Sequence, residues 1–518
     1  MRQRFFLFSV LLTMIGACAN PIKVNVSLQA PCDQPSALSG VSTYRVVVND
    51  GETVLSEGQF SSDEHSGAAF DQLAFGENIQ VSVEGWQGPN TPATVATPSA
   101  VVGRTLPMNL TTESGADDLE LKVLTGTTNS FGTVTSDEGA CQTIADVNGR
   151  HGHTSTYLPA LNKVLLVGGA VVDPSNAASE AFLSSVELFD PLTGTFEKMP
   201  AMGQVRAYHT ATLLDDGTVL VVGGFGNVNG IQQPLGSWVR IDPTQTEAAT
   251  AYTFGAMASG QGRAHHTATR LEPLPSLVVI AGGCVDSGCT PNSVSASAMA
   301  SGREFNSIEV FDATTNMVTV ASVALQHPRS MHAASYLGSG FILFTGGVGV
   351  GGVAECNVEL FNYSASTIVD SGVLPECPHL HQQVTLSDDS AMLVGGEIFS
   401  GNATSESNRV YIWRNGSIET NVITMVTARS KHQAVLLDNG SIMVVGGMRV
   451  AGGAVAELIS YEAAVGGYTV SSVVLPPAQS RDWLSAVKLP SNQVLITGGI
   501  TAVDPITTVR SAEIFFGP

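Results

Sequence analysis

Histidine recurs at one position of a repeated pattern in the C-terminal three-quarters of the chain, and imidazole is a common ligand of protein-bound metals. An arginine stands three residues before five of these histidines. The histidines are His153, His209, His266, His332, His381 and His432, and the arginines are Arg150, Arg206, Arg263, Arg329 and Arg429. A residue repeated at one register usually solves the same packing problem in each copy, and neutral imidazole can both donate and accept hydrogen bonds. We therefore expect structural histidines, and no metal or other cofactor.

Acidic residues recur in the same repeats, one in each of five strand-like segments: Glu187, Glu309, Glu359, Glu457 and Glu513. Partly buried charges need partners of opposite sign. We expect Arg–Glu contacts between strands or adjacent repeats, and the alternative is a set of solvated charges at the rim.

A glycine pair that ends an apolar run gives the period of the repeat. It occurs seven times, at Gly168-Gly169, Gly223-Gly224, Gly282-Gly283, Gly346-Gly347, Gly395-Gly396, Gly446-Gly447 and Gly498-Gly499. Turn signals such as Asp216-Gly217 and Asn439-Gly440 separate the apolar runs into four short strands per period. Four antiparallel strands in a repeat of this length are typical of a β-propeller blade.

The glycine pair, the Phe189-Asp190-Pro191 segment and the Arg-x-x-His element resemble the kelch family over about residues 140 to 518. The resemblance implies an all-β chain with a seven-bladed kelch propeller. Some copies depart from the pattern: Pro378 stands in place of the arginine, Trp413 in place of the aromatic-Asp pair, and Trp483 in place of the histidine. Six blades remain the alternative.

The seventh copy ends after a third strand, Ser511 to Phe516. Residues 128 to 135 precede the first copy and suit the missing fourth strand, which would pair the otherwise exposed edges. We therefore assign residues 128–518 to the propeller, closed by an N-terminal strand near 128–135.

The remaining N-terminal part divides into three segments. Residues 18–112 contain short alternating strands and predict a small β-sandwich, Ig-like or prealbumin-like. Residues 113–127 are assigned to a linker on their polar start around Gly115. Residues 1–17 have a basic start and a short apolar run, as in a secretory signal.

The signal ends in Ile15-Gly16-Ala17-Cys18, which resembles the bacterial lipobox. The resemblance implies cleavage before Cys18 and lipidation of its thiol, and Ala19 favours the outer membrane. The alternative is an ordinary cleaved signal. We expect a protein of the bacterial cell envelope that contacts the membrane only through its lipid.

Six cysteines remain after Cys18, and an even number suits disulfides in an oxidising compartment. Cys284 and Cys289 are close enough in sequence to close one loop. Cys356 and Cys377 flank two consecutive strands, and Cys32 and Cys141 could join the two domains.

The segment Tyr208-His209 resembles part of the copper site in the copper radical oxidases, which are themselves kelch propellers. The same Arg-x-x-His recurs here without the tyrosine, and the proposed disulfides leave no cysteine for the crosslink of those enzymes. Sialic-acid mutarotase is a further kelch enzyme, but no motif here points to it. A carbohydrate-active enzyme is therefore the alternative, and we assign no catalytic residue.

The net charge of −22 disfavours nucleic acid as a partner. Long loops between the second and third strands of each blade would share one face with the interblade connections, and loops on rigid scaffolds commonly carry function. The candidate ligand-binding residues there are Trp238, Asp286, Arg303, Glu304 and Glu397. We expect a monomeric module that binds a protein or a glycan.

Overall fold

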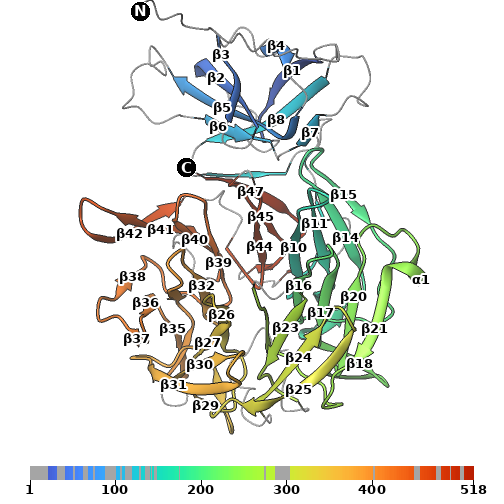
Figure 1. Cartoon of the computed structure of the whole chain (residues 1–518), viewed down its shortest axis with the longest axis vertical. Helices are drawn as coiled ribbons and strands as arrows, with labels where there is room; N and C mark the ends of the chain where they lie inside the picture. Colours follow the sequence, from blue (N-terminus) through green and yellow to red (C-terminus); the bar gives the residue numbers. More distant parts are fainter. Residues whose placement is uncertain are drawn as a thin grey trace, which may run out of the picture.

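The computed structural model is an all-β protein with one short helix, α1 (Ala248–Ala251), among the described residues. It describes residues 22–31, 41–50, 53–61, 68–73, 76–87, 101–105, 108–110, 119–127, 130–134, 141, 143–144, 149–173, 176–272, 276–285, 304–400, 403–447, 456–473, 480–490, 492–501 and 507–517. The N-terminal strands lie at one end of the molecule, next to strand β47 near the C-terminus (Figure 1).

The N-terminal domain is one continuous sheet in the order β3-β2-β5-β6-β8-β1-β4, with β7 beside β5. Its strands are β1 (Ile22–Gln29), β2 (Val41–Asp50), β3 (Thr53–Ser61), β4 (Ala68–Leu73), β5 (Gly76–Gln87), β6 (Val101–Arg104), β7 (Met108–Leu110) and β8 (Leu119–Thr127). Strand β8 pairs with β1 through Leu119–Leu124 and with β6 through Thr125–Thr127, so it connects the β1–β4 part of the sheet to the β2–β3–β5–β6 part. Buried Tyr44, Val48 and Val81 belong to its core.

The assignment of 113–127 to a linker is wrong for its C-terminal part, because residues 119–127 form β8. Residues 113–118 lie outside the described residues. The polar start of this segment precedes a run, Leu119 to Val123, that alternates apolar and polar residues as a half-buried strand does. The domain boundary therefore lies between β8 and β9 (Ser130–Thr133).

The described remainder of the chain contains seven antiparallel sheets of four or five strands, which we call ring sheets 1 to 7. In chain order they are β10 (Thr154–Leu158), β11 (Lys163–Val167), β14 (Val186–Asp190) and β15 (Thr195–Lys198); β16 (Thr210–Leu213), β17 (Val219–Val222), β20 (Ser237–Ile241) and β21 (Tyr252–Ala256); β22 (Thr267–Arg270), β23 (Leu277–Ala281), β24 (Ser307–Asp312) and β25 (Met317–Ala324); β26 (Ala333–Tyr336), β27 (Phe341–Thr345), β30 (Asn357–Asn362) and β31 (Thr367–Val373); β32 (Gln382–Thr385), β33 (Ala391–Val394), β36 (Arg409–Arg414), β37 (Ser417–Ile418) and β38 (Ile423–Thr424); β39 (Gln433–Leu436), β40 (Ile442–Val445), β41 (Ala456–Glu462) and β42 (Gly467–Val473); and β44 (Ser485–Lys488), β45 (Val494–Thr497), β47 (Ala512–Phe516) and β9.

The pattern of side chains along each ring sheet explains the order of its strands. The second strands are short runs of Val, Leu, Ile and Met that are almost entirely buried, as in Val219–Val222 and Ile442–Val445. The first strands carry Thr, Ala and Gln and are half-buried, and the outermost strands, such as Met317–Ala324, are largely exposed. β-Branched side chains favour the pleated, two-sided environment of a central strand.

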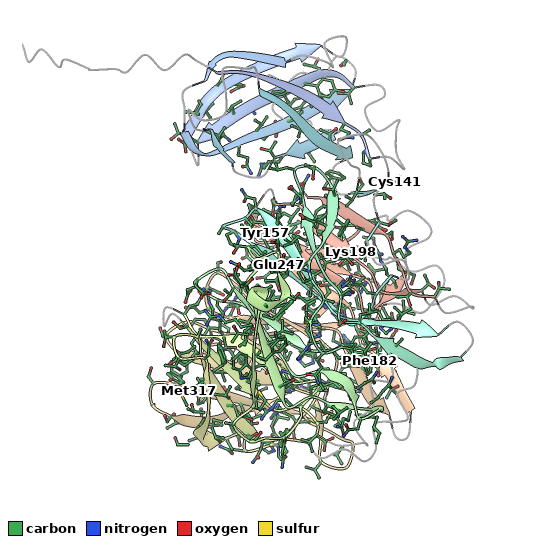
Figure 2. All side chains as sticks on the ribbon, turned by 90° about the vertical axis from the view of Figure 1, so that its right-hand side faces the viewer. Cys141, Tyr157, Phe182, Lys198, Glu247 and Met317 are labelled. Carbon is green, nitrogen blue, oxygen red and sulfur yellow. A yellow bond between two sulfur atoms is a disulfide. The ribbon has the colours of Figure 1, made fainter. Side chains whose placement is uncertain are left out.

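Four of the ring sheets carry an additional hairpin between their second and third strands. They are β12 (Ala170–Asp173) with β13 (Asn176–Phe182), β18 (Phe225–Val228) with β19 (Ile231–Pro234), β28 (Val348–Gly349) with β29 (Val353–Ala354), and β34 (Glu397–Ser400) with β35 (Ala403–Glu406). Figure 2 shows the first of these hairpins, which ends at Phe182, projecting from the body of the ring. Two further short strands, β43 (Arg481–Asp482) and β46 (Ile500–Thr501), pair beside ring sheet 7.

The glycine pairs connect each ring sheet to the next. The N–H of the second glycine donates to the carbonyl of the residue at the arginine position of the following sheet, over 2.8–3.0 Å in all seven cases. The last of these bonds runs from Gly499 to Arg150 and returns to ring sheet 1. Pro378 fits the fifth sheet because this bond uses only its carbonyl.

The predicted closing strand is present. Strand β9 pairs antiparallel with β47, with Phe131 opposite Phe515. First strands of neighbouring ring sheets contact one another, and β44 contacts β10. Val102 of β6 packs against the cluster that contains Ile514 and Phe516, so the N-terminal domain rests on this closing sheet.

Candidate functional site

One backbone position stands out at the start of each ring sheet, directly before the histidine position, which in ring sheet 7 is occupied by Leu484 and not, as expected, by Trp483. All seven residues there have a left-handed backbone, with φ between 53° and 58°. We call them the mouth residues: Gly152, Tyr208, His265, Met331, Leu380, Lys431 and Trp483. A left-handed conformation costs a non-glycine residue about 1–2 kcal/mol, and such residues cluster at functional sites.

Backbone hydrogen bonds hold the mouth residues next to one another. The N–H of Tyr208 donates to the Gly152 carbonyl at 2.8 Å, and Gly152 in turn donates to Trp483 at 3.1 Å. Four further bonds of 3.0–3.2 Å join Met331 to His265, Leu380 to Met331, Lys431 to Leu380 and Trp483 to Lys431. These bonds offset the backbone strain and fix the side chains around one opening.

All seven mouth residues line a cavity of about 510 Å³, together with residues of the first strands. Behind them its walls carry small or amide side chains, including Ser155, Ala211, Ala268, Gln382 and Gln433. A cavity of this size fits within the range of small-molecule sites, and hydroxyls and amides supply both donors and acceptors.

One arc of the mouth is aromatic. The Tyr208 ring lies edge-on to Trp483 with centroids 4.9 Å apart, and its centroid is 5.6 Å from that of His265. Glycine at position 152 makes this arrangement possible, because a Cβ there would lie 2.8 Å from Cε1 of Tyr208. The opposite arc, formed by Met331, Leu380 and Lys431, has flexible aliphatic stems and an amine.

Tyr208 is held from behind by two buried groups. Its hydroxyl lies 3.2 and 3.3 Å from the two carboxylate oxygens of Glu180 and 3.3 Å from Nδ1 of His151. Burial lowers the pKa of His151 to about 3, so its imidazole is neutral at pH 7. Glu180 comes from the projecting hairpin, which therefore helps to orient a residue of the mouth.

Lys431 in the opposite arc is paired with Glu397. The Lys431 Nζ lies 2.5 Å from Oε1 of Glu397, which also accepts from the Ser430 hydroxyl at 3.1 Å. Burial raises the pKa of the Glu397 carboxyl, but the hydrogen bond from His379 and the Lys431 charge outweigh it and bring the pKa to about 2. The cationic side of the mouth is thus neutralised by its own carboxylate.

The repeated histidines lie between ring sheets. The Nε2 atoms of five of them are 2.8–3.1 Å from the hydroxyl of a threonine in the preceding sheet: His153 with Thr497, His209 with Thr154, His266 with Thr210, His332 with Thr267 and His381 with Thr345. Burial lowers the pKa of His209 and His381 to about 3. These contacts account for the repeated histidine as a connection between neighbouring sheets.

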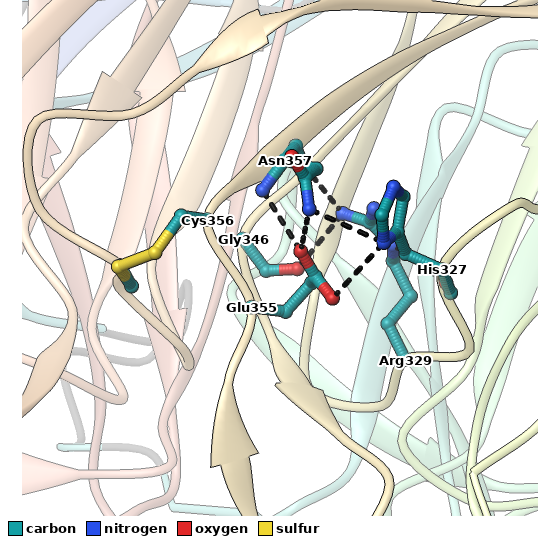
Figure 3. Close-up of a disulfide and its surroundings, with 7 residues drawn as sticks. His327, Arg329, Gly346, Glu355, Cys356 and Asn357 are labelled. Carbon is teal, nitrogen blue, oxygen red and sulfur yellow. Dashed lines mark hydrogen bonds and ion pairs between the residues drawn. A yellow bond between two sulfur atoms is a disulfide. The ribbon is translucent and has the colours of Figure 1, made fainter.

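The expected Arg–Glu contacts are present, and each lies within one ring sheet. The pairs are Arg150–Glu187, Arg263–Glu309, Arg329–Glu359, Arg429–Glu457 and Arg481–Glu513, with side chains at most 2% exposed. Figure 3 shows how Arg329 also donates to the carbonyls of Gly346 and Asn357, at 3.0 and 2.9 Å. The alternative of solvated rim charges is wrong for these residues.

The disulfide expected between Cys356 and Cys377 is present beside this cluster (Figure 3). Cys141 and Cys284 each form a disulfide as well. Their expected partners, Cys32 and Cys289, lie outside the described residues, as does Cys18.

Two of the expected ligand-binding residues are not on an exposed loop surface. Trp238 is 4% exposed, packs on Phe311 with centroids 5.0 Å apart, and donates through Nε1 to the Ala256 carbonyl. Glu397 is buried in its ion pair with Lys431. Their expected place in exposed loops is wrong, because Trp238 belongs to the third strand β20 and Glu397 begins the hairpin strand β34.

The other three expected residues contribute less. Asp286 and Arg303 lie outside the described residues. Glu304 is half-buried and forms an isolated bridge with Cys284.

The sequence analysis does not group the mouth residues into one site, although the repeat contains a signal. The arginine, the histidine and the glycine pair recur from copy to copy, while the residue before the histidine position differs in every copy. A framework position keeps one side chain, so a position that varies inside a constant frame has no shared packing role.

The copper-oxidase resemblance of Tyr208-His209 finds a structural explanation in the same geometry. His209 is buried and contacts Thr154, whereas Tyr208 contacts Glu180 and His151. Among the residues that the structure describes, no three His, Cys, Asp or Glu side chains converge as a metal site would require.

No protein-family model and no curated protein matches this sequence. Among solved structures similar to it is one described as "Structure of YjhT", with 15% sequence identity and a TM-score of 0.47. The match covers 62% of this chain and 98% of that one. No helix in the described part of the chain is long and apolar enough to cross a bilayer.

Proposed function

We propose that this protein is a lipid-anchored envelope protein whose ring is a seven-bladed kelch-type propeller that binds a polypeptide or a glycan at its mouth. The seven in-register glycine pairs, the bond from Gly499 to Arg150 and the β9–β47 pairing support this architecture. The lipobox pattern ending at Cys18 supports the anchor and the outer membrane as its place.

The observation that carries the binding function is the set of seven mouth residues. Each is held in a left-handed backbone conformation, which is strained in the six that are not glycine, yet the side chains range from glycine to tryptophan. Strain repeated at every sheet and combined with varied side chains around a cavity suits recognition.

The aromatic arc indicates the chemistry of the ligand. Tyr208, His265 and Trp483 offer rigid rings that bury much area at little cost in side-chain entropy, as in many recognition surfaces. Hydroxyls and amides further along the channel would fix the orientation of a polar ligand. The acidic chain has no excess of cations here, which agrees with a ligand that is not a polyanion.

Glycan and peptide arrays with the purified protein test this function. We expect wild-type protein to give defined signals that fall at least tenfold in Trp483→Ala, because the ring that would contact ligand is lost. Phe254→Ala is the matched control, since it removes a 52% exposed ring on an outer strand. No wild-type signal, or equal signals from all three proteins, would contradict mouth binding.

A carbohydrate-active enzyme is the second candidate, and the contacts of Tyr208 favour it. A hydroxyl shared between a buried carboxylate and a neutral imidazole is a possible acid–base group. Tyr208→Phe keeps the ring and removes the proton. Turnover of a bound sugar that is lost in this variant while binding persists would support catalysis, and stoichiometric copper or zinc in the purified protein would contradict a function of binding alone.

A further inference from the structure

A second cavity, of about 690 Å³, lies at the opposite end of the first strands from the mouth. It is lined by the turns between the first and second strands of ring sheets 5 and 6, and by residues of β41, β42 and β44. We call it the tyrosine groove, after Tyr461 and Tyr468 in its wall.

The two tyrosines form a fixed pair across strands. Tyr461 and Tyr468 are direct partners on β41 and β42, and their rings meet edge-to-face with centroids 5.4 Å apart. Tyr461 is 59% exposed, an unusual exposure for an aromatic ring that a neighbour already orients. The pair presents one ring face to solvent without further ordering.

Oriented polar groups line the same cavity as this ring. Asp388 is held by Arg414 at 3.0 Å and Asp438 by Lys488, and both carboxylates remain about half exposed, at 51% and 50%. Asn439 uses Oδ1 to accept the N–H of Ser441 at 3.0 Å, which leaves its amide N–H groups as donors. The groove therefore offers acceptors and donors at fixed places beside an apolar ring face.

We propose that the tyrosine groove binds a neutral polysaccharide, with a pyranose ring stacked on Tyr461. A sugar ring combines a C–H face, which packs on an aromatic ring, with hydroxyls that donate to carboxylates and accept from amides. Each carboxylate is paired with a cation, so the groove has no excess positive charge that would attract an acidic sugar or a phosphate. This site is separate from the mouth and does not depend on the function proposed for it.

Native gel electrophoresis of the full chain through gels containing a soluble polysaccharide tests the proposal. The neutral probes are hydroxyethylcellulose, glycogen, xylan and laminarin, and polygalacturonate is the acidic one. We expect retardation by at least one neutral probe and by none that is acidic. Tyr461→Ala should raise the dissociation constant for that polysaccharide roughly tenfold or more, because the stacking face is lost.

Three variants make the result specific. Tyr461→Phe keeps the ring and should be retarded nearly as wild type, and Phe254→Ala removes an exposed ring elsewhere. Trp483→Ala changes the mouth and should leave retardation unchanged, so failure of one site is distinguished from failure of the other. Mobility of the wild type unaffected by every neutral probe, equal retardation of Tyr461→Ala, or Tyr461-dependent binding of peptides alone would overturn the proposal.

Discussion

Buried arginines show how single residues define the frame of this protein. Where a sheet has the arginine and a third-strand glutamate, the two meet; ring sheet 5 has Pro378 and Tyr411 and lacks both. Ring sheet 2 keeps Arg206 but has Val239 in place of the glutamate. Arg206 bonds instead to the Gly223 carbonyl and to Ser237, and burial lowers its pKa to about 10.

Replacing Glu359 with Gln tests the frame at this scale. The carboxylate accepts from Arg329 and from the N–H of Gln326, both at 2.5 Å, and the variant leaves a buried guanidinium without a counter-charge. We expect the free energy of unfolding to fall by about 3–5 kcal/mol, measured by urea denaturation at pH 7.

Glu197→Gln is the control, because Glu197 is 71% exposed and lies 3.8 Å from Lys163. Its effect should stay within about 0.5 kcal/mol. Equal free energies of unfolding for the two variants would show that the buried Arg329–Glu359 pair stabilises the protein no more than an exposed pair does.

At the scale of elements, the glycine pairs set how closely one sheet approaches the next. Gly498 has φ of 61°, and a Cβ there would clash with the carbonyl oxygen of Arg150. The same close approach recurs from Gly168 to Arg206 and from Gly223 to Arg263. The short distance allows the neighbouring glycine N–H to reach the carbonyl.

Gly498→Ala should therefore destabilise the protein more than a left-handed backbone alone requires. Gly217→Ala is the matched control, since Gly217 has φ of 82° and nothing lies within 4 Å of its added Cβ. We expect a loss of about 1–2 kcal/mol for Gly217→Ala from backbone strain, and at least twice that for Gly498→Ala. Thermal denaturation of both proteins measures the difference. Equal losses would mean that the close approach between neighbouring sheets can relax without a loss of stability.

For the whole molecule, the buried histidines make stability depend on pH. His151, His209 and His381 have folded-state pKa values near 3 because burial disfavours the cation. In the unfolded chain they titrate near 6.5. As the pH falls below this value the unfolded chain takes up protons that the folded chain cannot, so stability is complete above about pH 6.5 and decreases towards pH 3.

Each such histidine should contribute about 1.4 kcal/mol per pH unit well below pH 6.5. Urea denaturation at pH 7.5, 6.5, 5.5 and 5.0 measures the slope before most carboxylates titrate. His209→Gln should reduce the slope by one proton. A stability that stays flat or rises from pH 7 to 5 would contradict neutral buried histidines.

The sequence predicted the frame well because the frame repeats. Seven glycine pairs, the closing strand near residue 130, the Arg–Glu pairs and the Cys356–Cys377 bridge each follow from spacing or from a simple charge argument. The prediction of a linker was wrong at residues 119–127. Strand β8 pairs with strands far away in sequence, and local polarity does not indicate such pairing.

The candidate site was harder to predict, for a physical reason. Trp238 was chosen for its residue type in a long segment, but a third-strand position buried it. The mouth residues share only a backbone conformation, and a left-handed φ at Leu380 or Trp483 leaves no signature in residue type. Their proximity depends on seven sheets meeting around one axis.

The pairing of β9 with β47 has a consequence for the order in which the sheets can form during synthesis. Synthesis delivers β9 before any ring sheet and β47 after all the others, whereas every other ring sheet is built from strands that follow one another. Each of those sheets can form as it emerges, but the edge of β9 stays unpaired until the last sheet arrives. A chain cut anywhere before β47 leaves the edge of β9 unpaired, and an unpaired strand edge can pair with other chains. The last ring sheet can therefore be completed only after β47 has been synthesised.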